Sequence, residues 1–592
     1  MRFVMPRHHR SPARVCGWYV AYGNLCNLEE EVRWCDEHFT VIDGQWEWSA
    51  SERFIAAGDA RLSNRDELLI RIDQAVARGE MGRPSEETDA LSDLRIIALL
   101  WQTHGAQSVE LLWGAYSFCV WDRDRETAWL VRDRVGAETL YYTTEGSIRY
   151  AGARTHDVAR ATSSEIDLVA LRDYLCCAFV PGSRTMLRAV KELRPGTIMR
   201  LPEGDTSIYW QVQDRVGERG VPLETYSGRL RAILERTVSD SLPDREPVGV
   251  YLSGGLDSSC VGALAARLHN EPVHSYSIHF GKDCPNELEF STLVAEHCQM
   301  RHHIIEITPE SMWELLPETM AQLDDPIGDP LTVPNLILGR TAKITVNTIL
   351  NGEGGDPCFG GPKNQPMLLK QIYGQAGDIA TRDGLSKQVK PLSGIVASYL
   401  ASFQKCATDL PRLLRSEIWE RVRNEPSVFD NEFNNSGSYL NTLMFINTRF
   451  KGADHILTKV NNLTRAVGLR AHSPLFDDRM VELSSEIPPE YKLEGAREKA
   501  VLKAAVADLL PLRILERPKS GMMVPVQFWF RELWRRPAEA LLLSRRSHTR
   551  RFLNQDLVRD WINYREDVWG RYGVKLWLLA SLELWLQSHI RD

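Results

Sequence analysis

Seven consecutive residues, SGGLDSS at positions 253–259, combine residue types that bind an anion through backbone N–H groups. The serine and the two glycines allow a tight turn that brings the backbone close to a ligand. Ser258 and Ser259 add hydroxyl donors where a helix is expected to begin, at the positive end of the helix dipole. The run therefore predicts a site for phosphate groups.

Asp257 distinguishes this loop from one that binds phosphate alone, because a bare carboxylate would repel the anion. A divalent cation removes the conflict, and Mg²⁺ prefers one or two carboxylates together with phosphate oxygens. Asp356, in the second glycine-rich run NGEGGD (351–356), can supply the other carboxylate. A tight turn would explain either run alone, but two acidic loops on one rim of a sheet favour a site for Mg²⁺ and phosphate.

The positive charge that such a site needs is expected from Lys519, in the loop-forming run ERPKSGMMVPVQFW (516–529). The Walker A pattern GxxxxGK[ST] is missing from the first loop, so the lysine must come from elsewhere. A compact ammonium group on a flexible stem can neutralise phosphate or a developing oxyanion. The alternative, a solvated surface lysine, holds for most lysines of the chain.

Short β-rich runs alternate with helical patterns around these motifs. The runs are PVGVYL (247–252), PVHSYSIHF (272–280), HHIIEI (302–307) and KITVNTIL (343–350). Such alternation predicts a parallel, doubly wound α/β sheet, in which ligands lie beyond the carboxyl ends of the strands. Both glycine-rich loops directly follow such a run, so we expect them at the same rim.

The first 210 residues have a different pattern. Three runs alternate polar and apolar positions as half-buried antiparallel strands do, and a fourth predicts an amphipathic helix that ends at Gly105. They are AYSFCVWD (115–122), TAWLVRD (127–133), TLYYTTEGSIRYAG (139–152) and, for the helix, LSDLRIIALLWQTHG (91–105). The polar stretch 211–224 is a plausible linker. We therefore predict an α+β domain over 1–210 and an α/β domain with additional helices over 225–592.

The composition excludes several classes of protein. The chain has 592 residues, 43% of them hydrophobic, and a net charge of −8, which gives no electrostatic footprint for nucleic acid. The first residues, MRFVMPRHHRSPARVCG, lack the apolar core of a secretory signal. No run approaches the about 20 apolar residues of a membrane span. We expect a cytoplasmic protein that binds neither nucleic acid nor membranes.

At this point the motifs resemble those of the asparagine synthetase superfamily. The C-terminal half carries, in order, SYSIHF, DDPIGDPLTVP, LNGEGGDPCFGG, LTRAVGLRAHSPLFDDRMVELSSEIPPEYKL, REKAVLKAAVADLLP and RPKSGMMVP. The N-terminal half resembles the family's glutaminase domain through GDARLSNRDEL, WGAYSFCVWDRDRETAWLVRDRVGAETLYY and VKELRPGTI. The resemblance implies an Ntn-hydrolase-like sandwich followed by an adenylating domain. In such enzymes a carboxylate attacks the α-phosphate of ATP, and an amine then displaces AMP.

The resemblance also implies roles for particular residues. Asp257 and Asp356 would hold Mg²⁺, Lys519 would stabilise developing charge, and Glu353 would be the general base that deprotonates the incoming ammonium. Lys499 sits in a matching motif, where a structural ion pair is at least as good an interpretation. The implied contacts to ATP are Leu252, Ser253, Gly254, Gly255, Leu256, Asp257, Ser258, Ser259, Gly354 and, at the adenine, Ser277 and Ile278.

The glutamine site departs from the family pattern. Glutamine-dependent members need cysteine as the mature first residue, because its α-amino group is the base for the thiolate. Cys16-Gly17 resembles that start, but fifteen residues precede it. The family's Asn-Gly-Glu is Ala57-Gly58-Asp59 here, its Arg-Leu-Ser stretch has no match in 39–50, and its Ser-Asp-Thr-Glu motif keeps only Asp93. These losses predict a glutaminase fold without glutaminase activity.

The amine must then come from another source. Two branches of the superfamily use an amine of the substrate itself, to close a β-lactam ring or the macrolactam of a lasso peptide. Glu353 argues against the β-lactam branch, which has tyrosine at this position. DPCFGGPKNQPM (356–367) departs from the asparagine synthetase pattern, and the long segment 365–450 gives room for a larger substrate.

We therefore predict a lasso peptide cyclase. It would use ATP and Mg²⁺, act on a precursor peptide, and work beside a leader-binding protein and a leader peptidase. The alternative is an asparagine synthetase that uses free ammonia, or glutamine after processing exposes Cys16. A scaffold without activity is disfavoured, because the four positions concerned have the residue types that the chemistry needs: Asp257, Asp356, Glu353 and Lys519.

Overall fold

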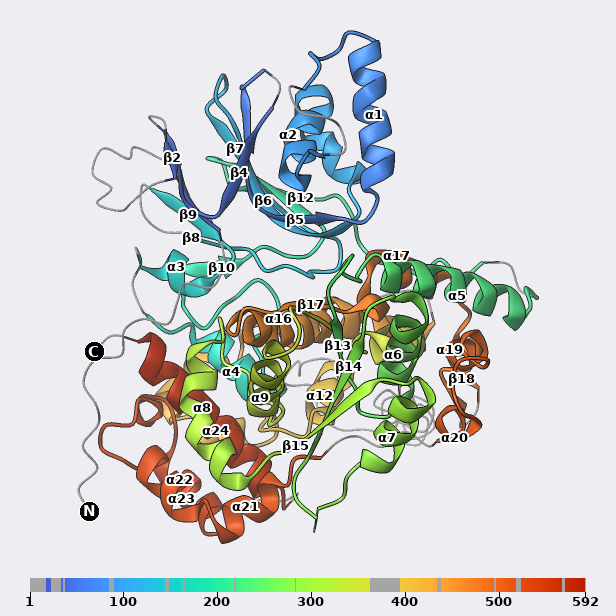
Figure 1. Ribbon diagram of the computed structural model, residues 1–592. Coiled ribbons are helices and arrows are strands. Elements are labelled where there is room, and N and C mark those ends of the chain that lie inside the picture. The colour runs from blue at the N-terminus through green and yellow to red at the C-terminus, as the bar shows by residue number, and fades with distance from the viewer. Residues whose placement is uncertain are drawn as a thin grey trace, which may run out of the picture.

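The computed structural model describes residues 18–22, 33–35, 38–49, 51–84, 90–143, 148–160, 162, 165–217, 220–282, 284–361, 394–433, 438–494, 497–517, 523–566 and 570–590. A β-rich part, formed by the N-terminal half of the chain, lies above a larger part that is rich in helices (Figure 1). Cys16 and Lys519 lie outside the described residues.

The N-terminal half contains two antiparallel sheets of six strands each. In spatial order the first sheet is β10 (Val190–Glu192), β8 (Tyr141–Thr143), β9 (Arg149–Gly152), β1 (Tyr19–Tyr22), β3 (Phe39–Asp43) and β2 (Trp34–Cys35). The second is β12 (Asp205–Ile208), β11 (Thr197–Leu201), β7 (Thr127–Arg132), β6 (Gly114–Asp122), β5 (Phe54–Leu62) and β4 (Gln45–Trp48).

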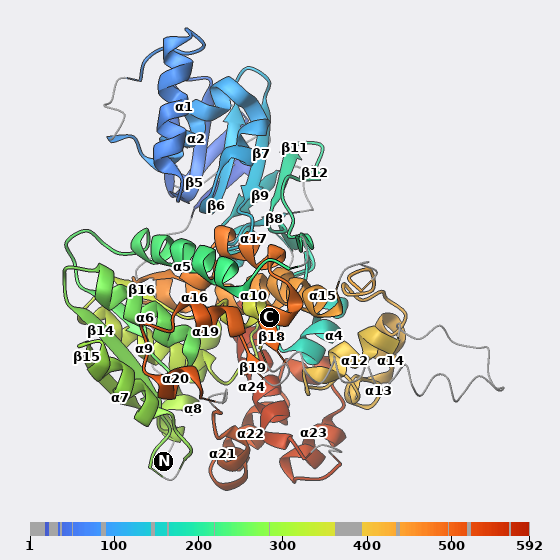
Figure 2. The same ribbon diagram turned by 90° about the vertical axis from the view of Figure 1, so that its right-hand side faces the viewer.

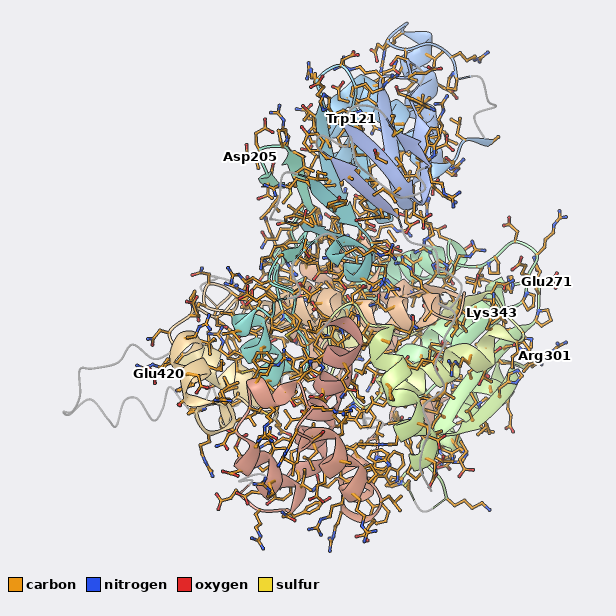
Figure 3. All side chains as sticks on the ribbon, turned by 90° about the vertical axis from the view of Figure 1, so that its left-hand side faces the viewer. Trp121, Asp205, Glu271, Arg301, Lys343 and Glu420 are labelled. Carbon is orange, nitrogen blue, oxygen red and sulfur yellow. The ribbon has the colours of Figure 1, made fainter. Side chains whose placement is uncertain are left out.

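Alternation along the strands explains the sandwich. Successive side chains of a strand point to opposite faces, so β6 sends Phe118 and Val120 to one apolar cluster and Cys119 and Trp121 to another. The first cluster includes residues of α1 (Arg65–Ala77) and α2 (Asp93–His104), and the second lies between the sheets. Trp121 lies inside the upper part in Figure 3.

The predicted elements of this half are confirmed with one refinement. The strands predicted at 115–122 and 127–133 are β6 and β7. The helix predicted at 91–105 is α2, which Ser92 caps through Arg95 N and which ends at Gly105, with φ 58°. The run 139–152 forms two paired strands, β8 and β9, instead of one.

The C-terminal half is built on a parallel sheet of five strands. Their spatial order is β15 (Arg301–Glu306), β14 (Val273–His279), β13 (Val248–Tyr251), β16 (Thr348–Leu350) and β17 (Arg470–His472). Their connecting helices include α6 (Leu256–Leu268), α7 (Leu288–His297), α8 (Pro309–Ala321) and α9 (Thr332–Lys343). Arg301, on the edge strand β15, lies at the outer surface in Figure 3. The predicted fold class, an α+β sandwich followed by a parallel α/β sheet, is confirmed.

One predicted strand is too long. KITVNTIL (343–350) begins as the end of α9 and a turn, and only Thr348–Leu350 form β16. Ile344 is apolar, which is typical of a strand, but its side chain is 82% exposed and the pairing with β13 begins only at Thr348.

The remaining described elements are mostly helices. They are η2 (Gly105–Leu111), α3 (Thr155–Ala159), α4 (Leu168–Cys177), α5 (Leu223–Ser239), α10 (Gly355–Phe359), α12 (Gly394–Ser402), α13 (Leu410–Leu413), α14 (Ser416–Val422), α15 (Tyr439–Ile446), the π-helix η4 (Asn447–Leu457), α16 (Thr458–Arg465), η5 (Pro474–Phe476), α17 (Asp478–Glu486), α18 (Pro489–Lys492), β18 (Leu493–Glu494), β19 (Arg497–Glu498), α19 (Ala500–Ala505), α20 (Leu512–Leu515), α21 (Val526–Glu532), α22 (Arg535–Leu542), η6 (Thr549–Arg551), α23 (Gln555–Ile562) and α24 (Tyr572–His589). None of the helices in the described part of the chain combines the length and apolarity that crossing a bilayer requires.

The apolar core crosses the predicted domain boundary. Buried residues of α4 belong to the same cluster as buried residues of α8 and α24. The Tyr174 hydroxyl of α4 donates a hydrogen bond of 2.8 Å to the Leu578 carbonyl of α24. Figure 2 shows α4 among the helices of the larger part, near α12 and α14. The division at 210–225 stays a prediction, and α4 binds the two halves together.

Candidate active site

The two glycine-rich loops meet at one rim of the parallel sheet. β13 and β16 are hydrogen-bonded neighbours, so the loops that follow them start side by side. A Cβ atom on Gly352 would lie 2.4 Å from the backbone nitrogen of Ser258, and one on Gly355 would lie 2.3 Å from the Asp257 carboxyl group. Glycine is therefore required where the second loop passes the first.

The serines hold the first loop in shape. Gly254 turns the chain with φ 74°, and the Ser258 hydroxyl lies 3.0 Å from the Ser253 hydroxyl and accepts from Ser253 N at 3.2 Å. α6 begins at Leu256, directly after this turn. The first backbone N–H groups of a helix have no partner within it, so the loop and the helix start together offer donors to an anion.

Lys499 forms ion pairs with both carboxylates that the sequence analysis predicts as metal ligands. Its Nζ lies 2.5 Å from Asp257 Oδ2 and 2.6 Å from Asp356 Oδ1, and its side chain is only 3% exposed. Burial alone would lower the pKa of Lys499, but the two carboxylates outweigh it and hold that pKa above its usual range. The ion-pair interpretation of Lys499 is therefore confirmed, and its partners are the predicted metal ligands.

The donor set fits Mg²⁺. Two carboxylates from different loops converge on the Lys499 ammonium group, and these three groups together carry one negative charge. Mg²⁺ takes one or two protein carboxylates and fills its other positions with water and phosphate oxygens. Asp257 and Asp356 would hold the ion, which would neutralise charge on the phosphates of ATP.

A cavity of about 390 Å³ opens beside these carboxylates. Most of the predicted site residues line it, namely Leu252, Ser253, Asp257, Ser258, Ser277, Ile278, Glu353, Gly354 and Asp356. Gly254, Gly255, Leu256 and Ser259 do not; the Ser259 side chain is fully buried. The Ser277 hydroxyl donates to the Leu252 carbonyl at 2.6 Å and lies 2.8 Å from His302 Nε2. The assignment of these residues to ATP stays a prediction.

Arg517 is a site residue that the sequence analysis did not identify. Its Nη1 donates to the Gly254 carbonyl at 3.0 Å, and its Nη2 pairs with Glu287, which lines the cavity. The guanidinium carbon lies 3.9 Å from the ring centre of Phe290. Arg517 therefore fixes the chain against the first loop, two positions before Lys519.

Other segments also bring charge to the cavity. We call the loop 324–329 together with η4 and α16 the distal wall, because Asp329, Lys451, His455 and Lys459 of these segments line the same cavity as the two glycine-rich loops. Asp329 accepts a hydrogen bond of 2.7 Å from Lys459 and lies 3.3 Å from His455 Nε2. Burial would raise the pKa of Asp329, but Lys459 and His455 hold it well below its usual range. Burial lowers the pKa of His455 to about 4. The wall therefore presents a permanent ion pair and a neutral imidazole.

Glu353 lines the same cavity. Its backbone N–H donates to Asn351 Oδ1 at 3.0 Å, which places Glu353 at the start of the second loop, and its charge helps to raise the pKa of Lys459 against the effect of burial. The motif DDPIGDPLTVP contains Asp329, but its sequence gave no reason to place that residue in the same cavity as Glu353.

The glutamine positions of the N-terminal half have other partners. Asp93 accepts from Arg65 Nη1 at 2.5 Å and from Leu62 N at 2.8 Å, so its carboxylate already has a structural role. Arg465, from the end of α16, pairs with Glu138 and acts on Asp59. Burial raises the pKa of Asp59 to about 6, against the effect of Arg465. An arginine of the C-terminal half thus acts electrostatically on Asp59, which the resemblance puts in the place of the glutamate of Asn-Gly-Glu.

Asp59→Asn is expected to stabilise the protein at neutral pH. The pKa of Asp59 in the folded state, about 6, lies above that of an ordinary aspartate in the unfolded chain, so the folded state binds the proton more tightly and loses stability as pH rises from about 4 to 6. Above pH 6 the charge on the half-buried Asp59 side chain costs about 1–3 kcal/mol, and asparagine removes that cost. Urea unfolding should show a gain for the variant at pH 7.5 and little difference at pH 4; a loss at pH 7.5 would contradict this account.

Asp133 is the matched contrast. Burial raises its pKa to about 6 as well, but its carboxylate accepts from Val135 N at 3.1 Å, Ala137 N at 2.9 Å and Glu138 N at 2.8 Å. Asn at this position would turn an NH₂ group toward backbone donors. Asp133→Asn should therefore destabilise the protein at pH 7.5, opposite to Asp59→Asn.

Comparisons with known proteins agree with this architecture. The asparagine synthase family model matches residues 229–587, and the glutamine amidotransferase domain model matches residues 77–211. Asparagine synthetase [glutamine-hydrolyzing] 1 of Bacillus subtilis (strain 168) is 24% identical over 84% of this chain and 81% of its own length. A putative asparagine synthetase [glutamine-hydrolyzing] of Mycobacterium tuberculosis (strain ATCC 25618 / H37Rv) is 25% identical over 72% of this chain and 69% of its own. Amidase chry2 of Gibberella zeae is 23% identical over 74% and 73%.

These matches cover both halves in the predicted order. The first model alone spans more than half of the chain and includes both glycine-rich loops, Lys499 and the distal wall. The protein therefore belongs to the asparagine synthase family and is an ATP-dependent ligase that forms amide bonds.

Proposed function

We propose that this chain closes a macrolactam in a peptide of the lasso type. It adenylates the side-chain carboxylate of an Asp or Glu and joins it to the N-terminal amine of the same peptide. The observation that supports the proposal lies at the positions where the resemblance predicts a glutamine site: Asp59 is under the charge of Arg465, and Asp93 accepts a hydrogen bond from Arg65. An enzyme that does not release ammonia from glutamine takes its amine from the substrate or uses free ammonia, and the proposal takes the first route.

In the first step the substrate carboxylate attacks the α-phosphorus of ATP. A bond forms between the carboxylate oxygen and phosphorus, and pyrophosphate leaves with the electrons of the broken P–O bond. The SGGLDSS loop and the start of α6 hold the leaving pyrophosphate through backbone donors. Arg517 keeps this loop in place through the Gly254 carbonyl. Lys519 is the expected source of the remaining positive charge.

In the second step the amine attacks the acyl carbon of the adenylate. The new C–N bond forms as the C–O bond to AMP breaks, and the nitrogen must release one proton. Glu353 lines the cavity beside the second loop and can accept that proton. The distal wall, with Asp329 and Lys459, would orient the remaining parts of the substrate through its fixed charges.

The test is a reaction of the purified full-length protein with Mg²⁺, ATP and a linear core peptide. The peptide needs a free N-terminal amine and an internal Asp or Glu. We expect a product that has lost one water, with one AMP and one pyrophosphate per ring. The precursor with its leader should react only when a leader-binding protein and a leader peptidase are added. A linear peptide that stays unchanged, while aspartate supports AMP release, would overturn the proposal.

The second candidate is an asparagine synthetase, which the names of the curated relatives favour. It would use free ammonia, or glutamine if processing exposes Cys16. Glutamate release from glutamine separates these cases: release together with asparagine formation supports the second candidate, and asparagine formed only from ammonium salts supports its ammonia-dependent form.

A further inference from the structure

The distal wall has a second face, which the N-terminal half covers. Arg194 donates from Nη1 to Asp454 Oδ1 at 2.7 Å and from Nη2 to the Arg449 carbonyl at 2.6 Å. Both acceptors belong to η4. Gly182 N donates to the other oxygen of Asp454 at 2.8 Å. The Asp454 side chain is only 1% exposed and that of Arg194 is 25% exposed, so the carboxylate of this pair is buried.

The same segment of the N-terminal half reaches a side chain that lines the cavity. The ring of Phe179 stacks on the ring of His455, with centres 5.3 Å apart and planes 9° apart. His455 lines the cavity and follows Asp454 in the chain. Consecutive residues of η4 therefore connect the N-terminal half to the cavity.

The loop of the distal wall is held in the same way. Gly328 N donates to the Ala178 carbonyl at 2.8 Å, and Met186 N donates to Asp325 Oδ1 at 2.7 Å. Arg154 Nε donates to Asp324 Oδ1 at 2.9 Å. These contacts come directly before Asp329, which faces the cavity.

The unusual backbone of η4, a π-helix, is in contact with the N-terminal half. A π-helix is rare, usually a single turn, and often found at functional sites. η4 runs from Asn447 to Leu457, and it carries Lys451 and His455 on the cavity, with Lys459 in the next turn. Its wide turns place these groups differently from an α-helix, and the Arg449 carbonyl is bound by Arg194 from outside the helix.

We propose that segment 178–194 of the N-terminal half positions the distal wall, so that this half shapes the part of the active site that receives the carboxylic acid and the amine. Arg194 is the central positioning residue. The inference is independent of which acid is the substrate, because the contacts are made by the protein alone.

The experiment compares the full-length wild type with Arg194→Met. Hydrogen–deuterium exchange should become about 10- to 100-fold faster for backbone amides of 447–465, which corresponds to the loss of charge-assisted hydrogen bonds. Exchange in β13 and β16, and the Kd for Mg·ATP, should stay within twofold. With the acid that supports AMP release, either the linear peptide or aspartate with ammonium, KM for the acid should rise about tenfold and KM for ATP should not.

Arg188→Met is the matched control, since Arg188 lies in the same segment, is 55% exposed and pairs with Glu165 at 2.9 Å. It should behave as the wild type. Arg194→Lys keeps a charge for Asp454 and should recover part of the protection. Phe179→Leu, which removes the stacking on His455 but stays apolar, gives a second variant if Arg194→Met folds poorly. Unchanged exchange at 447–465 in a folded variant, or equal acceleration throughout the chain, would overturn the inference.

Discussion

Asp257→Asn and Asp356→Asn are each expected to slow ATP-dependent AMP release by roughly 10²–10³-fold, about 3–4 kcal/mol in the barrier. Each change removes one of the two carboxylates that converge on the Lys499 ammonium. The remaining carboxylate is then neutralised by Lys499, and the charge that would attract Mg²⁺ is lost. The measurement is the rate of AMP release as a function of Mg²⁺ concentration.

Both variants should lose affinity for Mg²⁺ as well as rate. Higher Mg²⁺ is expected to recover part of the activity, because the second carboxylate is still present. Asp508→Asn is the control, since Asp508 is 64% exposed and pairs with Arg231 at 2.7 Å on the surface of the same half. It should change the rate less than twofold. Both active-site variants within tenfold of wild type at every Mg²⁺ concentration would refute the two-carboxylate site.

The parallel sheet and its loops were predictable because their signals are local. Val248 and Val250 are fully buried on a short strand, and glycines follow where the loops approach each other. A periodic apolar pattern and a glycine-rich turn can each be recognised within ten residues. The error at KITVNTIL has the same origin: Ile344 is apolar but exposed, and only the tertiary structure shows where α9 ends.

The rest of the site depends on contacts between distant parts of the chain. Lys499 reaches Asp257 across 242 positions, and Lys459 reaches Asp329 across 130. No local pattern indicates which of many lysines will be buried beside a carboxylate, because the free energy of such a pair depends on burial and geometry that only the fold provides. The π-helix η4 is a similar case, since its shape depends on partners such as Arg194.

Glu353→Gln is expected to separate the two chemical steps. Glutamine keeps the shape and the backbone contact to Asn351, so the carboxylate can still be adenylated and ATP–pyrophosphate exchange should stay within about threefold of wild type. Amide formation should fall by about 10²–10⁴-fold, because the attacking nitrogen has lost the group that accepts its proton. Lys459 retains Asp329 at 2.7 Å, so the fold should remain intact.

Rapid-quench experiments with the linear peptide can measure both steps, with aspartate and ammonium as the substitute if the peptide does not react. Acyl-adenylate and pyrophosphate should then accumulate in about one equivalent per enzyme before slow AMP release. Glu289→Gln is the control, since Glu289 is 63% exposed and pairs with Arg513 away from the cavity lining. If Glu353→Gln loses ATP–pyrophosphate exchange and amide formation to the same extent, the role of Glu353 would be substrate binding and not proton transfer. An unchanged rate of amide formation would mean that solvent or the AMP leaving group accepts the proton of the attacking nitrogen. The distal wall would then contribute only by positioning the substrate and by its charges.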